Sequence, residues 1–178
     1  FPRLPYDQAM EEYKSDRPDL RKDQDPQELA FAFVVDFPMF EKQTERKGWA
    51  PVHHPFTRPQ TDSIDQVKKN PGNIKAFQYD LVLNGSEIGG GSLRIYRPDM
   101  LQAVFQVLGH QDEEIRNNFG HLLEAFQYGV PPHGGIAIGL DRFLSIVLNE
   151  KNIREVIPFP KTEAGREMMS GALAPITP

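Results

Sequence analysis

Cysteine is absent from the 178-residue sequence, which excludes disulfide bonds and every metal site built on thiolate ligands. No run of about 18 apolar residues occurs, so we expect no membrane-spanning helix and no membrane partner. No basic segment leads into an apolar one at the start, and we predict no signal peptide and a cytoplasmic protein. The P-loop pattern GxxxxGK[ST] and the zinc pattern HExxH are also missing.

Acidic residues outnumber basic ones, 25 to 20, giving a formal net charge of -5. This balance argues against a broad phosphate-binding surface but leaves room for a small basic site. The length and a hydrophobic content of 39% predict a single domain over residues 1–178 that buries roughly 70% of its unfolded surface. The sequence opens with Phe1 rather than methionine, and we expect a segment of a longer protein.

Apolar patterning predicts an α+β fold with an antiparallel hairpin at its centre. We expect strands at 31–40, 77–83, 133–138 and 156–158, and helices at 7–13, 62–70, 100–108, 115–126 and 140–148. Asp62 is expected to cap the second helix. Residues 49–60 should form an ordered loop, and the tail beyond Lys161 should be loosely structured. Asn84–Gly85 is a strong signal for a two-residue hairpin turn.

Two acids flank this turn. With a two-residue turn, Val82 should pair with Glu87 and Asp80 with Gly89, so that Asp80 and Glu87 project from one face of the sheet. Two neighbouring carboxylates suit Mg²⁺, which usually keeps waters and shares substrate phosphates. The alternative is a pair of solvated acids on an exposed face.

Three glycines, Gly89, Gly90 and Gly91, follow Glu87 in the second strand of the predicted hairpin. Strand interiors normally avoid glycine. The three glycines clear a strip on which a flat ligand or another backbone could lie; a plain β-bulge is the alternative. Arg94 lies seven positions after Glu87, so an ideal strand would put the two on opposite faces. A bulge within the glycine triplet would bring both to one face, where Arg94 could grip a carboxylate. A surface salt bridge is the alternative.

His53 and His54 lie in the predicted loop, where they could bind an anionic group or form a structural pair. A second glycine-rich strand is joined to a helix by four residues, Gly139, Leu140, Asp141 and Arg142. Asp141 is either the helix cap or a functional acid. A cation in the first helical turn is unfavourable for the helix dipole, so Arg142 predicts a bound anion such as a triphosphate. These features together describe a nucleotide site on an antiparallel sheet.

The sequence resembles the C-terminal part of the catalytic domain of bacterial-type aspartyl-tRNA synthetases. The similarity is carried by SDRPDLR (15–21), FVVDFPMFE (33–41), HHPFT (53–57), YDLVLNGSEIGGGSLRI (79–95), YGVPPHGGIAIGLDRF (128–143) and NIREVIPFPKT (152–162). GLDR is shared with the synthetases for asparagine and lysine, whereas HHPFT together with NGSEIGGGSLRI is more specific.

The resemblance implies a class II fold, an antiparallel sheet flanked by helices. It implies that ATP activates L-aspartate to aspartyl-adenylate, and that the aspartate passes to the 3′-terminal adenosine of tRNA. Arg94 would grip the aspartate side chain, and His53 would help to close that pocket. Glu87 and Asp80 would hold Mg²⁺ and ATP, and the segment Gly139–Arg142 would be the third class II motif, with Arg142 at the γ-phosphate. No side chain need act as a nucleophile.

Nothing in the sequence matches the anticodon-binding barrel of this family, its first two motifs, or the large bacterial insertion expected between Arg21 and Phe31. We therefore expect the isolated chain to be inactive, because the second motif supplies an arginine for the α-phosphate. The full enzyme should be a homodimer. Two alternatives stay open: a non-catalytic module that binds a nucleotide or a partner, and a ligase that adenylates aspartate without charging tRNA.

Overall fold

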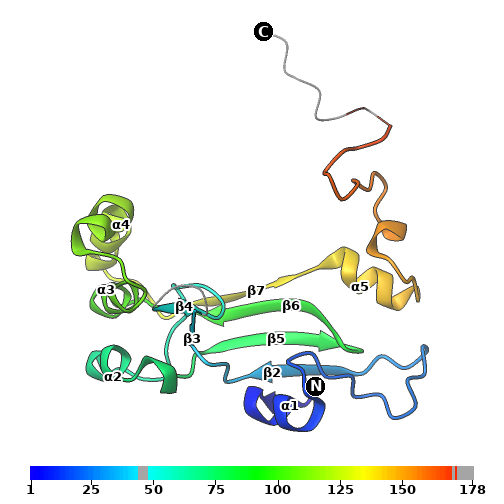
Figure 1. The fold of residues 1–178 in the computed structure, drawn as a ribbon, viewed down its shortest axis with the longest axis horizontal. Coiled ribbons are helices and arrows are strands. Elements are labelled where there is room, and N and C mark those ends of the chain that lie inside the picture. Colours follow the sequence, from blue (N-terminus) through cyan, green and yellow to red (C-terminus); the bar gives the residue numbers. More distant parts are fainter. Residues whose placement is uncertain (44–47, 170, 172–178) are drawn as a thin grey trace.

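The computed structural model describes residues 1–43, 48–169 and 171. Its centre is a five-stranded sheet with the strand order β1-β2-β5-β6-β7 (Figure 1). A separate pair, β3-β4, lies beside it. The strands are β1 (Arg3–Pro5), β2 (Phe31–Val35), β3 (Phe40–Lys42), β4 (Trp49–Pro51), β5 (Gln78–Leu83), β6 (Ser86–Leu93) and β7 (Gly134–Ile138).

The α+β class is confirmed, and the sheet is antiparallel from β2 to β7. It is mixed as a whole because β1 pairs with β2 in parallel, matching Arg3 with Phe33 and Pro5 with Val35. A three-residue strand is too short to leave a periodic pattern, which is why the sequence did not indicate it.

Helices gather at both ends of the sheet: α2, α3 and α4 at one end and α5 at the other (Figure 1). The helices are α1 (Tyr6–Tyr13), α2 (Ile64–Lys69), α3 (Pro98–Val107), α4 (Asp112–Gln127) and α5 (Leu140–Val147), with 3-10 turns η1 (Pro71–Asn73) and η2 (Ile153–Val156). All five predicted helices are present. No helix of the described residues is long and apolar enough to cross a membrane.

Four local predictions were wrong. The cap of α2 is Ser63, whose side chain accepts a hydrogen bond from the Gln66 N–H, and not Asp62. The strand predicted over 31–40 ends at Val35 because Asp36 adopts a left-handed backbone with φ 59°. The loop predicted at 49–60 contains β4, and the strand expected at 156–158 is absent, since η2 extends through Val156. Of the predicted loose tail, residues 170 and 172–178 lie outside the described residues.

The core has three parts. Between α2, α3, α4 and the β3-β4 pair, buried side chains such as Leu101, Val104 and Phe105 form the largest cluster. One face of the central sheet packs Val34 and Val82 against Ala9 of α1. The other face packs Leu81, Leu83 and Ile88 against α5. The sheet is therefore covered on both faces near the β5-β6 turn, and the site described below lies on the Val82 face, where that cover ends.

Candidate functional site

The hairpin between β5 and β6 sets the direction of every polar side chain in the site. Asn84 and Gly85 form the predicted two-residue turn, both with positive φ (50° and 79°), and Val82 pairs with Glu87 as expected. The register then shifts, so that Leu81 pairs with Gly89 and Ile88 is the extra residue. The structure therefore contains the predicted bulge, but one residue before the glycine triplet, and Asp80 pairs with Gly90 rather than with Gly89.

The position of this bulge has a packing reason. Ile88 is only 3% exposed and lies in the cluster with Leu81 and Leu83 on the far face of the sheet. Within Gly89–Ser92 the ladder is regular, since these residues pair with both β5 and β7. A regular ladder keeps Gly90 and Ser92 on one face, and the bulge turns Glu87 to that same face.

Asp80 and Glu87 converge above Gly90. A Cβ atom added to Gly90 would lie 2.9 Å from Asp80 Oδ1 and 3.1 Å from Glu87 Oε1. Asp80 is 8% exposed, so it is no solvated surface acid. Burial, and secondly the negative charge of Glu87, raise the pKa of Asp80 to about 6. A cation between the two carboxylates would remove this repulsion.

The three glycines have different surroundings. Gly90 faces the site, as the two carboxylates show. A Cβ on Gly89 would lie 2.8 Å from the Ala137 carbonyl oxygen, and one on Gly91 would lie 2.7 Å from Tyr79 Cε2. The outer two glycines thus allow close approach of β7 and of Tyr79 on the opposite face. The sequence predicted a bare strip over Gly89, Gly90 and Gly91. Only at Gly90 would an added Cβ point toward the two carboxylates of the site.

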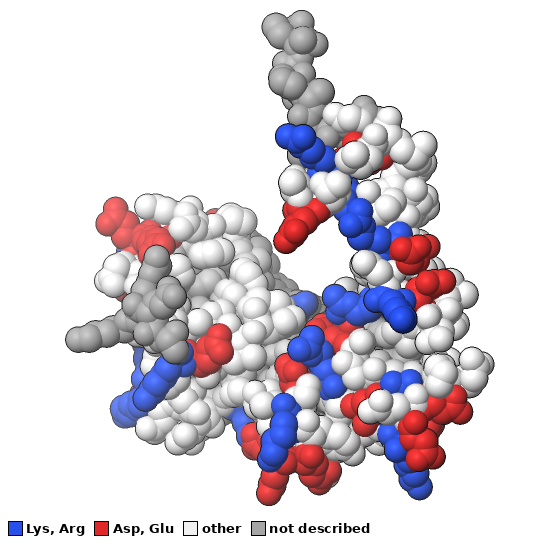
Figure 2. All heavy atoms as spheres, turned by 45° about the vertical axis from the view of Figure 1, so that its right-hand side comes forward, with Lys and Arg blue, Asp and Glu red and all other residues white. Residues whose placement is uncertain are grey.

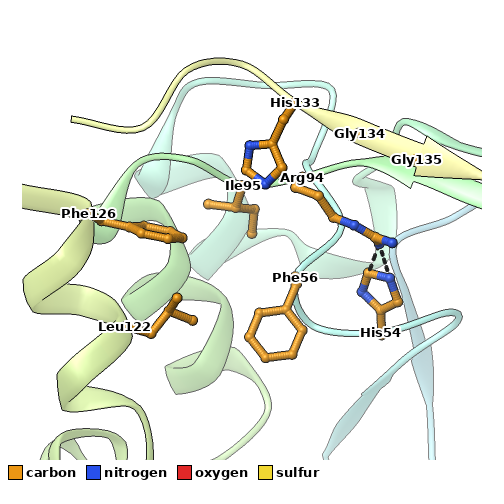
Figure 3. A pocket seen from close by; sticks show the side chains of 9 residues that line it. All are labelled: His54, Phe56, Arg94, Ile95, Leu122, Phe126, His133, Gly134 and Gly135. Carbon is orange, nitrogen blue, oxygen red and sulfur yellow. Dashed lines mark hydrogen bonds between the residues drawn. The ribbon is translucent and has the colours of Figure 1, made fainter.

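Arg94 follows β6 and points toward the histidine loop (Figure 3). Its guanidinium donates hydrogen bonds to His54 Nε2 and to Ser92 Oγ. Thr57 Oγ1 lies 3.3 Å from His54 Nδ1 and donates to Ser92 Oγ at 3.3 Å. A neutral His54 ring that accepts from Arg94 at Nε2 carries its proton on Nδ1, the nitrogen that faces Thr57 Oγ1. Arg94 is therefore on the same face as Ser92, Gly90 and the two acids.

Both histidines are held neutral. Burial, the neighbouring His53 and the charge of Arg94 lower the pKa of His54 to about 4. Burial and Arg94 also lower the pKa of His53, and the two rings lie 4.2 Å apart between centroids. Neutral imidazoles leave Arg94 as the positive group at this end of the site, suited to one carboxylate.

Two cavities open on this face. The Arg94 cavity, of about 500 Å³, is lined by His54, Phe56, Arg94, Ile95, Leu122, Phe126, His133, Gly134 and Gly135 (Figure 3). The Glu87 cavity, of about 330 Å³, is lined by His53, Glu87, Ile88, Gly89, Gly90, Ala137, Gly139, Asp141, Arg142 and Ile153. The adjacent histidines line different cavities, so the two cavities are neighbours along the β6 strand.

Arg142, in the first turn of α5, lines the Glu87 cavity. Gly139 is the N-terminal flanking residue of α5, and no side chain caps this helix, so Asp141 is not its cap. Arg142 Nη1 donates to the Glu87 carbonyl oxygen, and its side chain remains exposed in the cavity. Asp141 lies beside Arg142 in the same first turn. A cation at the positive end of a helix is unfavourable for the helix dipole, which fits an anionic ligand.

Charge is mixed over the face that Figure 2 draws. Figure 2 shows acidic and basic side chains interleaved over one face, without a large area of one sign, and an open hollow between the body and the C-terminal arm. Among the described residues, no three His, Cys, Asp or Glu side chains gather into a metal-binding group. Two carboxylates are nevertheless enough for Mg²⁺ when phosphates supply further oxygens.

Sequence reasoning missed four residues of the site: Thr57, Gln78, Ser92 and His133. Strand alternation could have found Gln78 and Ser92, since each lies two positions from a predicted site residue on the same face. Thr57 and His133 come from loops and reach the site only through tertiary packing. His133 lines the Arg94 cavity, and its backbone carbonyl accepts the Arg94 N–H.

The largely antiparallel sheet flanked by helices is the fold of class II tRNA synthetases. The chain belongs to the family described as "tRNA synthetases class II (D, K and N)", whose model matches residues 1–163. Among curated relatives, the "Aspartate–tRNA(Asp/Asn) ligase" of Dehalococcoides mccartyi is 51% identical over 148 residues, 83% of this chain and 25% of the relative. That of Heliobacterium modesticaldum is 51% identical over 154 residues, 86% of this chain and 26% of the relative.

Solved structures share the fold. An aspartyl tRNA synthetase from Entamoeba histolytica superposes with a TM-score of 0.65 at 24% identity, covering 94% of this chain and 33% of that chain. An asparaginyl-tRNA synthetase from Pyrococcus horikoshii gives a TM-score of 0.64 at 23% identity, covering 92% and 36%. The chain thus spans about a quarter of the length of the curated relatives that it matches.

Proposed function

We propose that this chain is the C-terminal segment of the catalytic domain of an aspartate–tRNA ligase. The full protein would join L-aspartate and ATP into aspartyl-adenylate with release of pyrophosphate, and then transfer the aspartate to the 3′-terminal adenosine of a tRNA. The observation that carries the proposal is one sheet face with Arg94 at one end and Glu87 with Arg142 at the other. The roughly 50% identity to curated relatives named as aspartate–tRNA ligases supports it.

The Arg94 cavity is the proposed aspartate end. A guanidinium presents parallel N–H donors that match a carboxylate, and the hydrogen bonds of Arg94 to His54 and Ser92 fix its plane. The neutral His54 would close the pocket without attracting a second carboxylate, whereas His53 lines the neighbouring Glu87 cavity. In this assignment Arg94 recognises the carboxylate that distinguishes aspartate from asparagine.

The Glu87 cavity is the proposed ATP end. Asp80 and Glu87 would hold Mg²⁺, which when bound neutralises phosphate charge. Gly139, Leu140 and Asp141 would lie along the nucleotide, and Arg142 would meet the γ-phosphate. The chain's own residues then act by binding and orientation: Arg94 holds the amino acid and Arg142 holds the triphosphate, so that the aspartate α-carboxylate faces the α-phosphorus. Such positioning of the reactants and stabilisation of the developing charge accelerate an in-line displacement at phosphorus.

The remaining parts of the proposal rest on the resemblance alone. The anticodon-binding barrel, the insertion domain, the tRNA contacts and the homodimer interface would belong to the full protein, and residues 1–178 would form a single domain within it.

The test uses a chimera in which this chain replaces the aligned segment of the Heliobacterium modesticaldum ligase. Aspartate-dependent exchange of pyrophosphate into ATP is measured for the chimera and for its Arg94→Ala variant. We expect the variant to raise the KM for aspartate at least a hundredfold and the KM for ATP less than threefold, because Arg94 lies in the Arg94 cavity only. Equal losses for both substrates would contradict the assignment. Arg58→Ala, in which the lost arginine lies over Phe77 and Tyr96 and lines neither cavity, is the matched control.

A further inference from the structure

Buried polar side chains in this chain are concentrated under the site. Only five described polar or charged residues are buried, and four of them, Thr57, Gln78, Asp80 and Ser92, belong to this one face. Thr57 and Ser92 are hydrogen-bonded to each other and to the Arg94 network. Gln78 and Asp80 form the other half of the row, where Gln78 pairs with Ser92 and Asp80 with Gly90 of β6.

Gln78 makes one hydrogen bond through its side chain. Its Nε2 atom lies 3.5 Å from Asp80 Oδ2 and donates to it. Its Oε1 is the one buried side-chain oxygen or nitrogen of the described residues that has no partner, and the residue as a whole is only 6% exposed. A buried carbonyl without a donor destabilises a fold. Gln78 is therefore a poor choice for a residue that only fills the core.

The two carboxylate oxygens of Asp80 face different partners, and Gln78 contacts one of them. Asp80 presents Oδ2 to Gln78 and Oδ1 to the space above Gly90, where Glu87 Oε1 also points. A carboxylate that is free to rotate would exchange these two oxygens. The amide donor fixes which oxygen faces Glu87, and residues that orient a metal ligand in this way commonly change metal affinity roughly 10- to 100-fold when replaced.

We propose that Gln78 is a positioning residue that holds Asp80 with one oxygen turned toward Glu87, so that the two carboxylates receive a divalent cation. The inference rests on the proposed function, because it takes Asp80 and Glu87 as the cation-binding pair. Gln78 itself does not touch the cation. Its position on β5, two residues before Asp80, places both side chains on the same face by strand alternation.

The experiment titrates Mn²⁺ into the ¹⁵N-labelled chain and follows the broadening of backbone amide signals near Gly90, since Mn²⁺ accepts the same hard oxygen ligands as Mg²⁺. For Gln78→Met we expect at least a tenfold higher midpoint of Mn²⁺ broadening, together with an unchanged or higher melting temperature without metal. The stability readout matters because the substitution removes the unpartnered carbonyl. A purely structural Gln78 would instead lower the melting temperature and leave the midpoint unchanged, and either result overturns the inference.

Controls separate this inference from the proposed function. Glu87→Gln should abolish the selective broadening; if it does not, the assigned cation site fails and the inference fails with it. If Glu87→Gln abolishes broadening while Gln78→Met leaves the midpoint unchanged, only the inference is overturned. In an Asp80→Asn background, Gln78→Met should have no further effect, since Gln78 acts through Asp80. Gln78→Leu provides a second variant if the methionine variant does not fold.

Discussion

Replacing Asp80 by asparagine should stabilise the fold at neutral pH. In the wild-type chain Asp80 must lose its proton while 8% exposed and beside Glu87. Burial and that neighbouring charge raise its pKa from 3.8 to about 6. The asparagine side chain would keep the shape of the aspartate and the contact with Gln78 but would carry no charge at any pH.

The size of the effect follows from the pKa. A rise from 3.8 to about 6 is roughly two units, which corresponds to about 3 kcal/mol at about 1.4 kcal/mol per unit. Because the folded-state pKa is raised, the stabilising contribution of Asp80 is fully present below pH 3.8. It is lost as the pH rises through about 6. The Asp80→Asn variant should therefore gain up to about 3 kcal/mol over wild type at pH 7.5 and little near pH 4.

Urea unfolding followed by the fluorescence of Trp49, the single tryptophan, measures this difference at pH 4.5, 5.5, 6.5 and 7.5. A difference that does not grow with pH, or a variant that is less stable at pH 7.5, would refute the assignment of a desolvated Asp80. Asp19→Asn is a control of opposite sign. A hydrogen bond from Arg21 lowers the pKa of Asp19, so its contribution is present at neutral pH and is lost on acidification.

Three further predictions concern other parts of the chain. The isolated chain should show no aspartate-dependent pyrophosphate exchange, because it covers a quarter of its relatives; robust exchange by the purified chain would contradict the proposed division of the site. Gly91→Ala should lower the melting temperature, because its Cβ would lie 2.7 Å from Tyr79 Cε2. Gly120→Ala, in open space on α4, should instead raise stability by up to about 1 kcal/mol. The ring nitrogen NMR shifts of His54 should not titrate between pH 5.5 and 8, given a pKa of about 4; a midpoint near 6.5 would show that Arg94 does not face it.

The central hairpin was predictable because its signals are local. Alternation over 77–83 and the Asn84–Gly85 turn determine the pairing of Val82 with Glu87. They could not locate the bulge, because its position depends on Ile88 reaching the core on the far face. A regular ladder between β5 and β6 would have placed Arg94 and Glu87 on opposite faces of the sheet. The predicted bulge places them on one face, although it lies at Ile88, one residue before the glycine triplet.

Residues joined to the site only by tertiary packing were out of reach of the sequence. The contacts of Arg94 with His54 and Ser92 bring together a loop and a strand end separated by about 40 positions. The different roles within Gly89–Gly91 depend on the neighbouring strand β7 and on the ring of Tyr79, which lies on the opposite face. Arg142 was predicted from helix electrostatics, whereas for Asp141 the sequence left open a helix cap or a functional acid. The structure shows that Gly139, and not Asp141, occupies the cap position.

The choice of amino acid tests the central claim most directly, because the family includes enzymes described for D, K and N. Pyrophosphate exchange by the chimera should be measured with aspartate, asparagine and lysine at equal concentrations. We predict exchange with aspartate at a rate at least a hundredfold above that with asparagine or lysine, since Arg94 is the positive group beside the neutral His54. Exchange that is faster with asparagine or lysine, or absent with all three in a folded chimera that still binds ATP, would contradict the proposed function.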